Sequence, residues 1–287
     1  MKWNDIRDFG NVSVKSWMRS AADSLFPRDC PVCGEIVTPR GQRICRGCLQ
    51  KLDFVKGHTC ARCGKEIPGG TRKLSGGADD LPDGTRKLSG GADGPSDGMR
   101  KLSGGAEDLC YDCRQMPKSF ERGFALLNYD TVSQNCMVRI KYHHMKEDVQ
   151  LYADLAAARL GGRLRALGAD YLVPVPVHPS RQRERGYNQA EVLAEALSQR
   201  LGIPVGRDFL LRTRKTAAQK ELNAEERFRN LQEAFAIGNI CPDAQHILLV
   251  DDIYTTGATL EACTRILRSA GVKKVWCFCI CIGREIY

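Results

Sequence analysis

The chain has 287 residues, of which 43% are hydrophobic, and it carries a formal net charge of +9. This length and hydrophobic content allow a large buried core and one or two domains, and they exclude a wholly disordered chain. The positive charge suits polyanionic ligands, although charge alone selects none. We find no run of about eighteen apolar residues and no signal-peptide pattern at the N-terminus, so we expect a cytoplasmic protein.

Apolar residues recur at helical spacing in the first 25 residues, among them Val14, Trp17 and Leu25, and the pattern stops at Pro27. We expect a short helix that packs against the domain following it. A helix lying on a membrane surface is the alternative, but few basic residues flank the apolar face.

Eight of the 14 cysteines form four CxxC pairs near the N-terminus. Two such pairs complete a tetrahedral zinc site with no open position for chemistry, so we predict two structural Zn²⁺ ions. Redox-active CxxC motifs are the alternative, but a motif of that kind would be single and lie in a βαβ unit. Sequence does not fix the pairing, and we favour first with second and third with fourth over a crossed arrangement. The predicted ligands are Cys30, Cys33, Cys45, Cys48, Cys60, Cys63, Cys110 and Cys113.

A repeat with a period of 14 residues separates the third pair from the fourth: TRKLSGGAD begins at 71 and 85, and MRKLSGGAE begins at 99. Each copy has a single Leu as its large apolar residue, so three copies cannot build a core. We predict that residues 68–108 form a mobile loop inserted into the zinc domain. A functional basic patch is the minor alternative, and a solenoid is a remote one.

From residue 119 the pattern is α/β. A strand is predicted over Phe124–Tyr129, and an Ala- and Leu-rich helix over about Val149–Leu167. The apolar run that starts at Tyr171 contains Pro174 and Pro176, which favour an edge strand or no strand.

Arg181, Arg183 and Arg185 then crowd a predicted loop immediately before a helix. A basic loop at a helix start suits a diphosphate, with a solvated basic turn as the alternative. Further on, Asn223 and Glu226 form a capping box that starts another helix. The basic segment that precedes this helix has no large apolar anchor, so we expect it to move as a lid.

The stretch VDDIYTTGAT carries the strongest signal in the chain. The buried run 247–250 predicts a strand, Asp251 and Asp252 stand at its carboxyl end, and a helix follows until Gly271. Small residues at a helix N-terminus bind phosphate through backbone N–H groups. Two carboxylates instead suit sugar hydroxyls or Mg²⁺. A ribose 5-phosphate would satisfy both the phosphate-binding loop and the acid pair. The alternative without a ligand is a strand end followed by an ordinary acidic N-cap.

The remaining cysteines are predicted to be core residues. Cys277, Cys279 and Cys281 alternate in VWCFCICI and therefore share one face of a strand. A third metal site there is a minor alternative.

VDDIYTTGAT resembles the 5-phosphoribosyl 1-pyrophosphate (PRPP) signature of type I phosphoribosyltransferases, except at Tyr254, where that pattern prefers an aliphatic residue. Together with CPVCG, VPVPVHPSRQRERGYNQA and TAAQKELNAEERFRN, it resembles the competence protein F (ComF) family over about residues 24–283. The resemblance implies an α/β fold with a phosphoribosyltransferase-like parallel sheet flanked by helices and an N-terminal double zinc ribbon. The corresponding domains are an N-terminal helix (1–25), the double zinc ribbon with its repeat insertion (26–118) and the phosphoribosyltransferase-like domain (119–287).

The resemblance also implies site roles. Asp251 and Asp252 would meet the ribose hydroxyls and Mg²⁺, Arg185 and Gly186 would meet the pyrophosphate, and the region of Gln219 would form a hood. The residues implied to wrap the 5-phosphate are Thr255, Thr256, Gly257, Ala258 and Thr259. If the protein turns PRPP over, Asp251, Asp252 and Arg185 are the expected catalytic residues.

Two functional hypotheses follow. In the first, a PRPP-binding protein of the ComF type supports DNA uptake in natural competence, with single-stranded DNA and the competence machinery as partners. In the second, the protein is an active metabolic phosphoribosyltransferase of the amido or nucleobase type without a DNA role. His143, His144 and His178 are candidate general bases, and the resemblance assigns no acceptor site.

Overall fold

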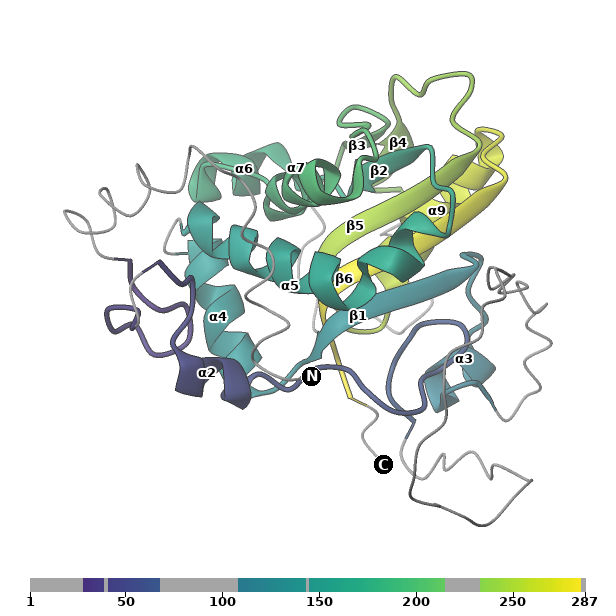
Figure 1. Cartoon of the computed structure of the whole chain (residues 1–287). Helices are drawn as coiled ribbons and strands as arrows, with labels where there is room; N and C mark the ends of the chain where they lie inside the picture. Colours follow the sequence, from purple (N-terminus) through teal and green to yellow (C-terminus); the bar gives the residue numbers. More distant parts are fainter. Residues whose placement is uncertain (1–27, 39–40, 68–107, 143–144, 215–232, 285–287) are drawn as a thin grey trace, which may run out of the picture.

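The computed structural model describes residues 28–38, 41–67, 108–142, 145–214 and 233–284 (Figure 1). The N-terminal helix predicted over 1–25, the repeats and the capped helix at Asn223 lie outside these residues. In chain order the elements are α2 (Arg46–Lys51), α3 (Tyr111–Gln115), β1 (Arg122–Asn128), α4 (Thr131–Tyr142), α5 (Lys146–Arg165), β2 (Tyr171–Pro174), α6 (Pro179–Arg185), α7 (Gln189–Leu201), β3 (Leu210–Arg212), β4 (Phe235–Ile237), β5 (His246–Tyr254), α9 (Ala258–Ser269) and β6 (Lys274–Ile282).

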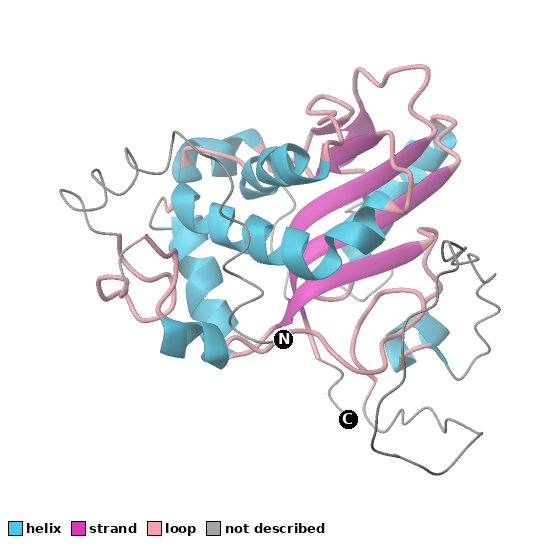
Figure 2. Cartoon of the chain, in the orientation of Figure 1, coloured by secondary structure: helices cyan, strands magenta, loops and turns pink. Residues whose placement is uncertain are grey.

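A four-stranded parallel sheet in the order β1-β6-β5-β2 forms the centre of the molecule. Helices α5 and α7 cover one face and α9 covers the other (Figure 2). The central strand β6 is buried from Val275 to Ile282, as its continuous apolar sequence requires for a strand covered on both faces. Cys277, Cys279 and Cys281 are therefore core residues, as predicted.

Strand β2 lies at one end of this sheet, a position that can accommodate a proline. Pro174 is its last residue and pairs in register with Val250. On the outer side, Leu172 exchanges backbone hydrogen bonds with the segment 204–206, whose Val205 forms an isolated bridge to it. An edge position tolerates a residue without an N–H group, so the edge-strand alternative is confirmed.

The opposite edge, along β1, is covered by the cysteine-rich region. Val55 N donates to Leu126 O at 3.0 Å, and Asn128 N donates to Asp53 O at 2.8 Å. The segment that follows α2 thus runs beside β1 (Figure 1). This pairing protects an edge strand that would otherwise offer unpaired backbone groups.

The prediction of a basic loop at 181–185 is wrong, because these residues form the helix α6. Pro179 occupies its first turn, and the His178 side chain accepts a hydrogen bond from Ser180 N as the N-cap. Gly186, with φ of 74°, ends the helix in the left-handed conformation. The basic residues therefore lie on one helical turn and not in an extended loop.

Strands β3 and β4 pair antiparallel as a separate two-stranded sheet, and they flank residues 215–232, which lie outside the description. Among the described residues, no helix is long and apolar enough to cross a membrane.

Candidate functional site

The acid pair lies inside the last four residues of β5, which is longer than the predicted strand because the ladder to β6 continues to Tyr254. Asp252 N donates to Asp251 Oδ1 at 2.8 Å. Asp252 Oδ2 also forms an ion pair at 2.8 Å with Nζ of Lys141, at the end of α4. No sequence motif points to Lys141, because a lysine in the last turn of a helix is common and offers no local signal.

Asp251 has an unusual protonation equilibrium. Burial raises its pKa to about 7, and the negative charge of Asp252 contributes in the same direction. Lys141 and Arg212 act against this rise. The carboxyl group is therefore poised to exchange its proton near neutral pH, which is common at functional sites.

The loop after the acid pair is open to solvent. Thr255 and Thr256 are exposed, and Gly257 precedes α9 with a φ of 72°. A Cβ atom at Gly257 would lie 2.2 Å from the Tyr254 hydroxyl oxygen, so only glycine fits. Glycine has no side chain to cap the first turn of α9, and the Thr256 hydroxyl accepts a 3.4 Å hydrogen bond from Ala258 N. Backbone N–H groups at a helix N-terminus of this kind can bind an anion.

Two consecutive residues of α4 connect the acid pair to the Gly186 turn. Lys141 contacts Asp252, and the ring of Tyr142 lies 5.4 Å from the Arg185 guanidinium carbon. Arg185 also donates to Gln189 Oε1 at 3.1 Å, which ties the end of α6 to the start of α7. The structure thus brings Asp252 of the acid pair and Arg185 of the predicted pyrophosphate site to the same end of α4.

The arginines at the base of the predicted hood are less available than the sequence suggested. Arg212 stacks 5.0 Å from the Phe235 ring centre, and burial together with the charge of Arg181 lowers its pKa. Arg214 pairs with Glu233 at 2.6 Å. Arg212 lies in β3 and Arg214 follows it by two residues, and the rest of the predicted hood lies outside the described residues.

The eight CxxC cysteines gather into two groups of four, in the sequential pairing that we favoured. Within each group the ligand atoms lie within 4.8 Å of one another. The sulfurs of Cys63 and Cys110 are 3.6 Å apart. A tetrahedral zinc with Zn–S bonds of about 2.3 Å requires a spacing of about 3.8 Å, whereas a disulfide requires about 2.05 Å. Both groups therefore fit a four-coordinate metal.

Local contacts support this assignment for the second group, Cys60, Cys63, Cys110 and Cys113, which is fully buried. Cys63 N points at Cys60 Sγ, 3.5 Å away, and Gly64 adopts a φ of 80°. The buried Lys65 ammonium binds Asp112 Oδ2 at 2.6 Å. Burial alone would lower the pKa of Lys65, but Asp112 and the neighbouring thiolates raise it. A permanent positive charge beside four thiolates offsets the net negative charge of a Zn(Cys)₄ centre.

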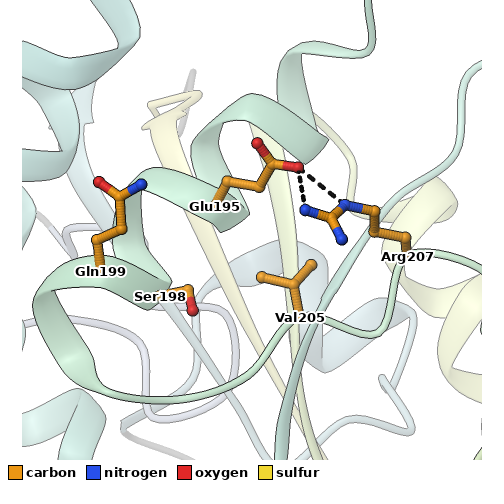
Figure 3. Close-up of a pocket in the computed structure, with 5 residues that line it drawn as sticks. All are labelled: Glu195, Ser198, Gln199, Val205 and Arg207. Atoms are coloured by element: carbon orange, nitrogen blue, oxygen red, sulfur yellow. Dashed lines mark hydrogen bonds and ion pairs between the residues drawn. The ribbon is translucent and has the colours of Figure 1, made fainter.

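A surface pocket lies away from this site (Figure 3). It lies between α7 and the segment around Val205 that follows this helix. At the pocket, Arg207 forms an ion pair with Glu195 at 2.6 Å. None of the predicted site residues is among its lining residues, which are Glu195, Ser198, Gln199, Val205 and Arg207.

Comparisons with known proteins agree with this architecture. Residues 21–77 match the double zinc ribbon domain, and residues 188–285 match the phosphoribosyl transferase domain. Competence protein F of Haemophilus influenzae is 31% identical over 177 residues, which cover 58% of this chain and 75% of that protein. The chain belongs to the ComF family. The zinc ribbon assignment and the two Cys₄ groups together support structural zinc.

Other ComF relatives extend the likeness. The DNA utilization protein YhgH of Escherichia coli is 30% identical over 175 residues, or 59% of this chain and 77% of that protein. Competence protein ComFC of Bacillus subtilis is 26% identical over 264 residues, or 87% of this chain and 88% of that protein. A purine phosphoribosyltransferase structure from Pyrococcus horikoshii covers 45% of this chain and 72% of its own at 20% identity, with a TM-score of only 0.28.

Proposed function

We propose that this ComF protein binds PRPP together with Mg²⁺ where β5 meets α9, and that it serves in the uptake or use of DNA. The observation that carries the proposal is the order of groups at this junction. A partly buried acid pair is followed, after two residues, by exposed threonines at the N-terminus of a 12-residue helix whose N-cap residue is a glycine. Ligands of open parallel sheets bind at the carboxyl ends of the strands, where this junction lies.

The parts of PRPP would divide between three groups. The 5-phosphate accepts hydrogen bonds from Thr255, Thr256 and the backbone of residues 257–259. The ribose hydroxyls donate to Asp251 and Asp252. Because hard oxygen donors suit Mg²⁺, the same carboxylates would hold the ion, and the ion when bound would neutralise charge on the pyrophosphate.

The pyrophosphate would lie between the end of α4 and the Gly186 turn. Lys141 and Arg185 are both cationic, and the contacts of Lys141 and Tyr142 bring them to the same helix end. If the bond between C1 of ribose and the pyrophosphate breaks, negative charge develops on the leaving group, and these two cations stabilise it. No general base is assigned, because His178 serves as the N-cap of α6, and the other two candidates, His143 and His144, lie outside the described residues. No residue is assigned to an acceptor either.

The DNA role rests on the relatives, which are named for competence and for DNA utilization. The net charge of +9 is compatible with a polyanionic partner. Arg183 is exposed on α6, two residues before Arg185, which is proposed to hold the pyrophosphate. We therefore propose that single-stranded DNA approaches along α6 and reaches the PRPP site.

A competition titration tests both parts. We expect the wild-type protein to bind PRPP with Mg²⁺ by calorimetry, and bound single-stranded DNA to lower the apparent PRPP affinity. DNA affinity should fall steeply with salt concentration as phosphate contacts release counterions. DNA that binds without affecting PRPP would place the two ligands in separate sites. Absent DNA binding, with turnover of PRPP on a small acceptor, would instead support a metabolic phosphoribosyltransferase.

A further inference from the structure

Tyr254 marks the point where the phosphate loop meets the cysteine-rich region. It is the last residue of β5, its side chain is buried, and its hydroxyl end packs against Gly257. A buried aromatic ring at the start of an exposed loop needs a local reason.

The second Cys₄ group supplies that reason. Tyr254 and the four cysteines of this group belong to one continuous cluster of buried side chains. Burial raises the pKa of Tyr254, as expected for a phenol enclosed in such a cluster. The ring therefore lies in the same buried layer as the second group, with its hydroxyl end at the loop.

A second contact joins the same two parts. Ser119, six residues after Cys113, donates from its backbone N and its Oγ to the two carboxylate oxygens of Glu261, both at 2.7 Å. Glu261 lies in the first turn of α9 and is only 2% exposed. Arg265 pairs with the same carboxylate at 2.7 Å. A buried, fully engaged carboxylate of this kind holds the N-terminus of α9 in a fixed position.

The first Cys₄ group, Cys30, Cys33, Cys45 and Cys48, has different surroundings. Cys30 and Cys48 pack in a separate cluster with Met137 and Ile140 of α4. The two groups therefore support opposite faces of the sheet. Only the second group shares a buried cluster with the residue that begins the phosphate loop.

We propose that the second Cys₄ group positions the phosphate loop through Tyr254 and Glu261, so that affinity for the phosphate ligand depends on this group being intact. The identity of the phosphate ligand rests on the proposed function. The coupling between the second Cys₄ group and the loop does not. Tyr254 is in this view a positioning residue, because it holds the loop without touching the ligand.

Hydrogen exchange of the full chain, measured for a peptide spanning residues 255–262, reads out the loop without any ligand. Tyr254→Val removes the ring and should speed exchange in this peptide, leave exchange in β1 and β6 unchanged, and retain both zinc ions. The same variant should weaken PRPP binding about tenfold, a typical coupling between two sites. Tyr254→Phe keeps the ring and should behave like the wild type in both assays.

Cysteine variants provide the matched comparison. Cys63→Ser opens the second group and should speed exchange in the same peptide, whereas Cys33→Ser, at the exposed ligand of the first group, should not. If Cys63→Ser does not fold, the comparison of Tyr254→Val with Tyr254→Phe tests the coupling instead. Unchanged loop exchange in Tyr254→Val, or equal loosening by Cys33→Ser, would overturn the inference. A wild-type protein that fails to bind PRPP would refute the proposed function, while the exchange comparison would still test the coupling.

Discussion

Replacing Asp251 with Asn should stabilise the protein above neutral pH. Its pKa rises from the ordinary value of 3.8 to about 7, mainly through burial and then through the charge of Asp252. The folded-state pKa is therefore above the unfolded value, and the unfolded chain releases the proton first. The resulting destabilisation is absent below about pH 4, grows between about pH 4 and pH 7, and is complete above that range.

The size of the effect follows from this difference. At about 1.4 kcal/mol per pKa unit, the rise from 3.8 to about 7 sets an upper limit near 4 kcal/mol. Because Asp251 keeps partial contact with solvent, screening reduces the penalty, and we expect Asp251→Asn to gain roughly 1–3 kcal/mol at pH 8. At pH 4.5 the gain should be small, since folded wild-type Asp251 is protonated there.

Urea denaturation at the two pH values measures the difference in free energy of unfolding between Asp251→Asn and the wild type. Divalent cations are left out of the buffer, and so are chelators, because a chelator would remove zinc. Asp252→Asn is the matched control. It removes the partner of the mostly buried Lys141 and should destabilise the protein at pH 8. Equal stabilisation by Asp251→Asn at both pH values, or destabilisation at pH 8, would refute the reasoning.

Elemental analysis should find two zinc ions per chain, because each group of four thiolates closes one tetrahedral site; one ion or none in metal-replete protein would contradict this. Arg185→Ala should weaken PRPP binding in calorimetry by about 1.5–3 kcal/mol through loss of a charge-assisted hydrogen bond, whereas Arg183→Ala should spare it. Equal losses in the two variants would argue against a specific role for Arg185. Deleting residues 71–98 removes two repeat periods and should change the free energy of unfolding by at most about 1 kcal/mol, with zinc content unchanged. A larger loss of stability would show that the repeats pack.

The strand, loop and helix around the acid pair could be predicted because their signals are local. An apolar run defines β5, and helical spacing defines α9 up to Ser269, close to the predicted stop at Gly271. The zinc ligands could be predicted for the same reason, since each CxxC turn is complete in four residues. Their pairing could not, because it depends on how the chain on either side of the repeat insertion folds back.

Contacts between distant segments escaped the sequence analysis. Lys141 meets Asp252 only because α4 packs beside the end of β5, and no local pattern marks that approach. Residues 181–185 form a helix although they carry no apolar stripe, and the local signal for that helix is its start, at His178 and Pro179. Tyr254 departs from the signature pattern, and its burial in the cluster that contains the second Cys₄ group gives it a packing role.

The most direct test of the account is calorimetric titration of PRPP with Mg²⁺ into the wild-type protein and into the double variant Asp251→Asn with Asp252→Asn. We predict Mg²⁺-dependent binding to the wild type and none to the double variant, with circular dichroism and zinc content showing that the variant is folded. PRPP affinity that is unchanged in the folded double variant, or absent from the wild type, would contradict the assignment of the junction between β5 and α9 as the phosphoribosyl site.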